Sequence, residues 1–332
     1  MGRDNSIEQT LSERAGLPFV AVPAAPVRGT GPVRLARNVA DLVRGTYRAM
    51  DILRRLRPDA IFATGGYVSV PAVVAGWLLR VPTLIYLPDM EPGLAVKALA
   101  RIATRVAVTA EQARRYFRQD KVIVTGYPIR DEFTALGRDS ARHRLGLSDD
   151  KVVLVFGGSR GASALNAAVE SALENLLGLA QLVHVCGEGD YAALSARRAS
   201  LPADKQARYH LFAYLDDLPA AVVAADLVVS RAGASVLGEF TAAGAPSILV
   251  PYPYAGRHQM TNARYLADHG AALVIDNDRL GVDLLPTVRG LLSDDARRHA
   301  MRENARRLAR PGAAQALAQA LRSLPASKGG LA

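Results

Sequence analysis

Short aliphatic runs alternate with segments of helical periodicity along most of the chain. In the first half the runs predict strands at residues 60–64, 83–87, 106–109 and 122–125. In the second half they predict strands at residues 152–156, 182–186, 209–212, 227–229, 247–250 and 272–275. Because this alternation is typical of parallel sheets built from βαβ units, we expect an α/β protein with two doubly wound domains.

The pattern also predicts where the domains meet. Residues 131–150 lack a strand pattern and contain Gly137 and Gly146, so we predict an interdomain connection between a first domain at 1–130 and a second at 151–310. Residues 311–332 are expected to form a C-terminal helix and a disordered tail. A doubly wound domain usually opens with a buried strand and a glycine-rich turn, and we expect the first domain to be incomplete there.

Composition and charge narrow the class of protein. The chain is 50% hydrophobic and 22% charged, which excludes a disordered or collagen-like polymer. No apolar stretch reaches the roughly 20 residues of a membrane-spanning helix, and the single cysteine, Cys186, indicates the reducing cytosol. Of the net charge of +10, +7 falls within residues 1–150, densest over 28–57. This positive charge predicts an anionic partner. Charge alone does not decide whether the partner is a nucleic acid, a membrane surface or a phosphorylated substrate.

Two turns in the second half suit phosphate binding. The strand at 152–156 runs into residues 157–162, whose glycines and following helix favour an anion, although a tight turn without ligand has the same pattern. A second small-residue turn spans 230–235, and Ser235 could cap the helix that follows. Glu239 lies one turn further on and could accept both hydroxyls of a ribose. The alternative interpretation is that Glu239 is an ordinary solvated residue on the helix surface.

Two further clusters are candidates for substrate contacts. His258 and Gln259, with Asn262, suit sugar hydroxyls, or else form an ordinary helix start with exposed amides. After the strand at 60–64, residues 65–69 open a helix and form a candidate acceptor or phosphate loop, or a plain turn.

The helical segment at 35–56 carries an apolar stripe flanked by arginines. Such a stripe suits a face that docks on anionic lipid, or equally a core-facing helix with a solvated basic side. The stripe consists of Leu35, Val39, Leu42, Val43, Met50 and Leu53.

Several of these motifs together resemble the MurG family of bacterial glycosyltransferases. They are Gly65-Gly66-Tyr67-Val68-Ser69, Glu91-Pro92-Gly93-Leu94, Gly126-Tyr127-Pro128-Ile129-Arg130, the turns at 157–162 and 230–235, and His258-Gln259. The resemblance implies a GT-B fold with two Rossmann-like domains facing a cleft. It also implies inverting transfer of N-acetylglucosamine from UDP-N-acetylglucosamine to undecaprenyl-diphosphate-linked N-acetylmuramoyl pentapeptide in peptidoglycan synthesis, with no cofactor or metal.

The resemblance also assigns roles by position. Arg130 and Ser159 would lie near the donor diphosphate, Leu215 against the uracil, and Glu239 on the ribose. The full donor-binding set is Asp89, Arg130, Ser159, Leu215, Ala234, Ser235, Val236, Glu239, His258 and Gln259. The acceptor side would comprise Gly65, Gly66, Tyr67 and Ser69.

The general base remains unassigned. The family's base is a histidine in an opening glycine-rich loop, and this chain has no histidine before His143, which leaves Asp89 as the candidate and predicts weak transfer. The alternatives are a transferase with another lipid acceptor, a UDP-sugar epimerase, and a catalytically impaired relative. We expect a peripheral protein on the anionic cytoplasmic face of the cell membrane, with no nucleic-acid partner.

Overall fold

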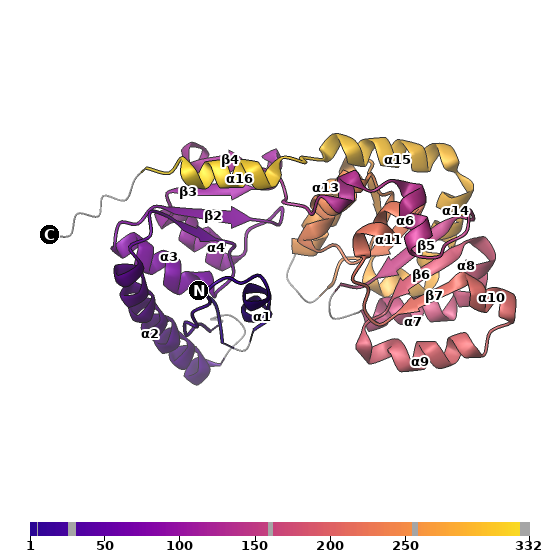
Figure 1. Cartoon of the computed structure of the whole chain (residues 1–332), viewed down its shortest axis with the longest axis horizontal. Coiled ribbons are helices and arrows are strands. Elements are labelled where there is room, and N and C mark those ends of the chain that lie inside the picture. Colours follow the sequence, from indigo (N-terminus) through magenta and orange to yellow (C-terminus); the bar gives the residue numbers. More distant parts are fainter. Residues whose placement is uncertain (5, 26–30, 159–161, 254–257, 326–332) are drawn as a thin grey trace. The chain divides into compact units, whose positions relative to one another are not determined.

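The computed structural model describes residues 1–4, 6–25, 31–158, 162–253 and 258–325. By internal contacts the chain divides into two compact units (Figure 1). Unit 1 comprises Met1–Thr125 together with Ala314–Ala332, and unit 2 comprises Gly126–Ala313.

Unit 1 is built on a parallel sheet of four strands in the order β1-β2-β3-β4. The strands are β1 (Ile61–Ala63), β2 (Thr83–Leu87), β3 (Arg105–Val108) and β4 (Val122–Val124). Helices α1 (Ile7–Arg14) and α2 (Pro32–Leu56) precede the sheet, and α3 (Ser69–Leu78) and α4 (Leu94–Ile102) connect its strands. Every residue of β2 is buried, as expected for an inner strand of a parallel sheet covered on both faces.

The two faces of this sheet have different covers. Ile85 and Val106 face a core shared with Val73 of α3 and Val96 of α4. Because side chains alternate along a strand, Leu84, Tyr86 and Ala107 point to the other face. There they pack against Leu317 and Ala320 of α16 (Ala313–Arg322), the last helix of the chain. One face of the first sheet is therefore covered by the C-terminal helix (Figure 1).

Unit 2 contains a parallel sheet of six strands in the order β10-β9-β8-β5-β6-β7. The strands are β5 (Val152–Phe156), β6 (Gln181–Val185), β7 (Tyr209–Phe212), β8 (Leu227–Ser230), β9 (Ser247–Leu249) and β10 (Ala272–Val274). The strand order reverses between β5 and β8. In open α/β sheets ligands bind at the carboxyl ends of the strands at such a reversal.

Helices surround the second sheet. They are α5 (Glu132–Ala135), α6 (Arg138–Arg144), α7 (Ser163–Ser171), α8 (Leu173–Leu179), α9 (Glu188–Ala199), α10 (Ala203–Arg208), α11 (Leu218–Ala224), α12 (Glu239–Ala243), α13 (His258–Asp268), α14 (Leu280–Ser293) and α15 (Asp295–Leu308). None of the helices in the described part of the chain is long and apolar enough to cross a bilayer.

All ten predicted strands are present, each with ends within one residue of the prediction. The contact-based division differs from the expected domain boundaries. It falls after Thr125 rather than after residue 130, and the segment expected as a connection holds α5 and α6. These helices belong to unit 2 because Phe133 is buried and Ala141 packs against Ala220 and other residues of α11.

Candidate functional site

Two turns leave the second sheet side by side. In the parallel pairing of β5 and β8, Phe156 lies opposite Ser230, so the segments after these residues start at the same edge. Gly158 has a φ of +91°, a left-handed conformation that favours glycine. Ser159 lies outside the described residues. The two small-residue turns predicted from the sequence thus share the carboxyl edge of adjacent strands.

The second turn offers backbone donors. After Ser230 the chain enters a short 3₁₀ helix, η3 (Ala234–Leu237). The Val236 N–H donates to the carbonyl of Gly233, and among the described residues the N–H groups of Ala234 and Ser235 meet no acceptor. The Val236 side chain is buried in the core, so this residue can contribute to a site only through its backbone. Two free N–H groups at one turn can receive a phosphate oxygen.

Glu239 begins α12 beside this turn and is half-buried. Burial raises the pKa of Glu239, while the nearby Arg130 guanidinium and a hydrogen bond from the Ser235 hydroxyl favour the carboxylate. The structure thereby brings together three of the residues that the resemblance assigns to the donor. A half-buried carboxylate with a hydroxyl donor and a guanidinium nearby is a preorganised acceptor for hydroxyl groups.

Gly238 positions the segment that carries Arg130. A Cβ atom at Gly238 would lie 2.6 Å from Cδ1 of Tyr127 and 2.9 Å from Cγ2 of Ile129. Only a glycine therefore allows this segment to pass directly over the start of α12. The guanidinium of Arg130 lies 5.4 Å from the ring centroid of Phe133, which limits where the arginine side chain can point.

The first turn of α13 supplies a third group of polar side chains. His258 and Gln259 are half-buried, and the Gln259 Oε1 accepts the Tyr252 N–H at 2.8 Å. The Gln259 side-chain NH₂ is then its remaining polar group for a ligand. Asn262 is fully buried and donates to the Ala232 carbonyl at 3.1 Å, so its predicted place on an exposed helix face is wrong. It ties α13 to the second turn instead of facing a sugar.

Arg231 is a site residue that lies within the turn predicted at 230–235 but was given no role there. Its side chain is buried, with 9% exposed, and Nη1 donates to the Val250 carbonyl at 3.2 Å. Its guanidinium lies 5.6 Å from the Tyr252 ring, and its Nε has no partner among the described residues. Burial lowers the pKa of Arg231, which marks an incompletely compensated cation at the foot of the second turn. An arginine directly after the buried strand at Leu227–Ser230 was the available signal.

Leu215 lies after β7, at the same carboxyl edge, and is half-buried. Strand β6 separates β7 from β5, so this residue stands two strands from the first turn. Sequence order alone could not have given this spacing, because it depends on the strand order of the sheet.

The acceptor-side residues lie in unit 1. Gly65 and Gly66 follow β1 with φ values of +89° and +74°, and a Cβ at Gly65 would lie 2.9 Å from Cγ2 of Val96. The Ser69 hydroxyl donates to the Gly65 carbonyl at 2.5 Å and closes the loop. Asp89 is half-buried after β2, the strand next to β1, so the loop and this carboxylate occupy one edge of the first sheet.

Tyr67, the remaining predicted acceptor-side residue, lies in the same loop. Its hydroxyl accepts a hydrogen bond from Nη1 of Arg3 at 3.4 Å. The contact joins the loop to the opening residues of the chain.

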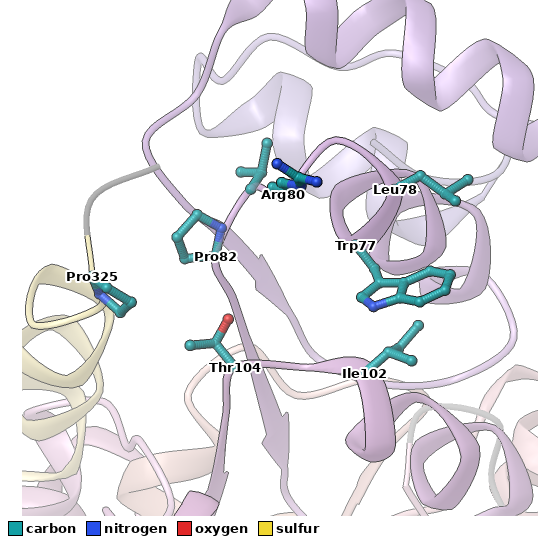
Figure 2. A pocket seen from close by; sticks show the side chains of 8 residues that line it. Trp77, Leu78, Arg80, Pro82, Ile102, Thr104 and Pro325 are labelled. Carbon is teal, nitrogen blue, oxygen red and sulfur yellow. The ribbon is translucent and has the colours of Figure 1, made fainter. Parts of the chain in front are cut away.

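A cavity of about 510 Å³ opens at the opposite, amino end of this sheet (Figure 2). Trp77 and Ile102 lie at one end of the cavity and Pro325 at the other, with Pro82 and Thr104 between them. Trp77 is 53% exposed, and the sequence reasoning gave it no role.

In the described part of the chain no three histidine, cysteine or acidic side chains gather as metal ligands would. These residues offer backbone N–H donors, arginine side chains, the half-buried carboxylate of Glu239 and side-chain amides. Such a set suits a nucleotide diphosphate and a sugar.

Comparison with known proteins gives the family. Residues 1–108 match the glycosyltransferase family 28 N-terminal domain, and residues 152–320 match the family 28 C-terminal domain. A relative from Roseiflexus sp. (strain RS-1) is 43% identical, over 98% of this chain and 83% of the relative. A relative from Desulforudis audaxviator (strain MP104C) is 39% identical, over 99% of this chain and 90% of the relative. Both are UDP-N-acetylglucosamine:N-acetylmuramyl-(pentapeptide) pyrophosphoryl-undecaprenol N-acetylglucosamine transferases.

Solved structures of similar fold support the same family. MurG of Acinetobacter baumannii has a TM-score of 0.75 at 26% identity, with 97% of this chain and 89% of that chain covered. A UDP-GlcNAc 2-epimerase of Neisseria meningitidis has a TM-score of 0.63 at 12% identity, with 96% and 89% covered, a likeness that shows the fold alone. The expected GT-B fold, with two Rossmann-like α/β units, is confirmed. The chain belongs to glycosyltransferase family 28, as a MurG-type member.

Proposed function

We propose that this protein transfers N-acetylglucosamine from UDP-N-acetylglucosamine to undecaprenyl-diphosphate-linked N-acetylmuramoyl pentapeptide, with inversion at the anomeric carbon. The observation that carries the proposal is the pair of turns on β5 and β8, with Glu239 beside them in the field of Arg130 and next to the Ser235 hydroxyl. Relatives that share 43% and 39% of their residues with this chain bear the name of this activity.

The donor diphosphate binds at the two turns. The N–H groups of Ala234 and Ser235, which make no backbone hydrogen bond to the described residues, donate to one phosphate, and Ser159 contributes to the other. Arg231 adds positive charge beneath the second turn, and Arg130 approaches from the segment above α12. As the bond to the sugar breaks, negative charge grows on the UDP leaving group, and these donors stabilise it without needing to reorganise.

The nucleoside and the sugar occupy the flanks of the turns. The carboxylate of Glu239 accepts the two ribose hydroxyls, and Leu215 packs on the uracil. His258 and the side-chain NH₂ of Gln259 bind sugar hydroxyls. The hydrogen bond from Asn262 to the Ala232 carbonyl fixes the start of α13 in this place. Val236 acts only through its backbone.

The acceptor belongs to unit 1. The loop at 65–69, with Tyr67 and Ser69, receives the acceptor, and Asp89 at the same sheet edge removes the proton from its attacking hydroxyl. A positioned base contributes about 10²- to 10⁴-fold to such a step. Replacing Asp89 by asparagine keeps the size of the side chain and removes its basicity.

A transfer assay tests this function directly. Radiolabelled UDP-N-acetylglucosamine and the lipid-linked muramoyl acceptor should give labelled disaccharide lipid, with Asp89→Asn slower by about 10²-fold or more. Asp139→Asn, in an exposed acidic position of unit 2, is the matched control. Product only with another lipid acceptor, or epimerised donor formed without any acceptor, would overturn the proposal in favour of the corresponding alternative.

The same function requires access to a lipid-bound substrate, and α2 has a face suited to it. Leu35, Val39, Val43 and Tyr47 recur every four residues and are all exposed, by 38% to 70%. Arginines flank the stripe at positions 34, 37, 44 and 48. We propose that this face docks on the anionic cytoplasmic surface of the cell membrane, because apolar insertion and cationic attraction to lipid add together.

The opposite side of α2 belongs to the core. Ala49 and Leu53 are buried, and Met50 packs against the same cluster. The single stripe described from the sequence therefore divides, with Leu53 and Met50 facing the core and Val39 and Val43 facing outward. Neighbouring α3 exposes Trp77, whose amphipathic ring suits a membrane interface.

A further inference from the structure

Unit 2 has a cavity of about 400 Å³ at the sheet edge opposite the donor turns. Its walls include Ala225, just before β8, and Ala245, just before β9, which places it at the amino ends of these strands. The donor turns start from the carboxyl ends, and none of their residues lines this cavity. The family comparisons and the proposed function leave it without a role.

Three arginines from two distant segments line the cavity. Arg302 and Arg306 lie one turn apart on α15, and Arg138 begins α6. Gly244, in the left-handed conformation at φ +62°, makes room for the pair on α15. A Cβ there would lie 2.7 Å from Nε of Arg306 and 3.1 Å from Cγ of Arg302.

The positive charge of this cluster is only partly balanced. Asp226 is shared by Arg138 at 2.6 Å and Arg142 at 3.1 Å. On the solvent side Arg306 pairs with Glu303 at 3.0 Å.

Arg302 forms no salt bridge within the part of the chain that the structure describes, and its Nε donates to the Gly244 carbonyl at 3.3 Å. Burial first, and then repulsion from Arg138 and Arg306, lowers the pKa of Arg302, and attraction to Asp226 offsets only part of this effect. A half-buried guanidinium whose charged neighbours are mostly arginines is stabilised by an incoming anion.

We infer that this cavity is a binding site for a compact phosphate or diphosphate group. Guanidinium groups bind phosphate oxygens in pairs, and three arginine side chains line this one space. Val222 and Phe133 form apolar walls, which exclude water and strengthen the attraction between the charges. The phosphate could belong to a free anion or to a lipid headgroup.

Calorimetric titration with pyrophosphate tests the site. The full chain is held in saturating UDP, so that the proposed donor site is occupied. We expect saturable binding to the wild-type protein and at least tenfold weaker binding to Arg302→Gln. Arg307→Gln removes the same charge from an exposed position of α15 outside the cavity and should bind like the wild type.

Two further measurements keep the result unambiguous. Arg306→Gln changes a largely exposed side chain, so it should fold normally and also weaken binding. Glu239→Ala should bind pyrophosphate as the wild type does, which separates this site from the donor site. Absence of saturable binding, or unchanged affinity in both Arg302→Gln and Arg306→Gln, would overturn the inference.

Vesicles distinguish the two sources of the phosphate. If the site takes a lipid headgroup, Arg302→Gln also reduces sedimentation with phosphatidylglycerol vesicles, whereas Arg307→Gln does not. If it takes a free anion, vesicle binding is the same for both variants while pyrophosphate affinity differs.

Discussion

The Nε2 atom of His184 lies 3.0 Å from Oδ1 of Asn166, deep in the second unit. The Asn166 NH₂ group donates to the Cys186 carbonyl and to the Asp190 carboxylate, at 2.8 Å and 2.6 Å. Its oxygen must therefore accept, so Nε2 of His184 carries the proton and Nδ1 accepts from the Tyr209 hydroxyl at 2.9 Å. This directed chain of hydrogen bonds fastens α7, the helix after the first turn, to β6 and α9.

The first prediction concerns acid stability. Burial lowers the pKa of His184 to about 4, below the roughly 6.5 of an unfolded histidine. The unfolded chain therefore binds this proton first, and the stability contribution of His184, complete above pH 6.5, is lost as the pH falls from about 6.5 to about 4. The loss amounts to about 3 kcal/mol, measurable by urea unfolding across this range.

A test variant and a control variant separate the effect of His184 on stability from that of the other titrating groups. His184→Gln should lower stability at neutral pH and flatten its decline toward pH 4, whereas the exposed His299→Gln should decline like the wild type. Identical slopes for His184→Gln and the wild type would contradict the assignment.

The second prediction concerns the donor. Glu239→Ala should weaken UDP binding by about 1–3 kcal/mol, because the ribose hydroxyls lose a charged acceptor. Glu239→Gln keeps an acceptor oxygen without the charge and should fall between the two. Calorimetry measures both, with the exposed Glu170→Ala as control. If Glu239→Ala binds UDP as tightly as the wild type, the ribose contact lies elsewhere.

The third prediction concerns the packing of α2. A Cβ at Gly45 would lie 2.0 Å from the Pro23 carbonyl oxygen and 3.1 Å from Cγ of Pro71, so Gly45→Ala should cost about 1–3 kcal/mol of stability. Gly290→Ala, inside α14 with open space around it, should gain about 0.5–1 kcal/mol. Denaturant unfolding compares the two, and equal effects would refute the tight contact.

The fourth prediction concerns the membrane face. Binding to vesicles should rise with anionic lipid and fall with salt, and Val43→Asp should reduce it several-fold because a charge then enters the apolar stripe. Val282→Asp, which alters an exposed valine of unit 2, should leave vesicle sedimentation unchanged. Equal binding to neutral and anionic vesicles would remove the electrostatic part of the proposal.

The sequence predicted the sheets well because buried parallel strands are short and almost continuously apolar. The run at 83–87 matches β2 residue for residue, and 152–156 matches β5. The turns after β5 and β8 were found for the same reason, since a strand that stops abruptly at glycine or a small polar residue marks its own carboxyl end.

Other features depend on partners distant in the sequence. Whether Val43 or Leu53 of α2 faces the core is decided by Pro23 and α3, which no local periodicity contains. Likewise His184 sits in an apolar run, and only the fold reveals that Asn166 and Tyr209 satisfy both of its nitrogens. Long-range packing, rather than local preference, decides these positions.

The cover that α16 provides has a consequence for biosynthesis. Ala107 leaves the ribosome about 210 residues before Leu317, the residue that packs on the same sheet face. At a translation rate of roughly 5–20 residues per second, the face bearing Leu84 and Tyr86 stays uncovered for about 10–40 s. All of unit 2 emerges during that interval, so the unit that is synthesised first is completed last, and the nascent chain presents an apolar surface that chaperones can bind.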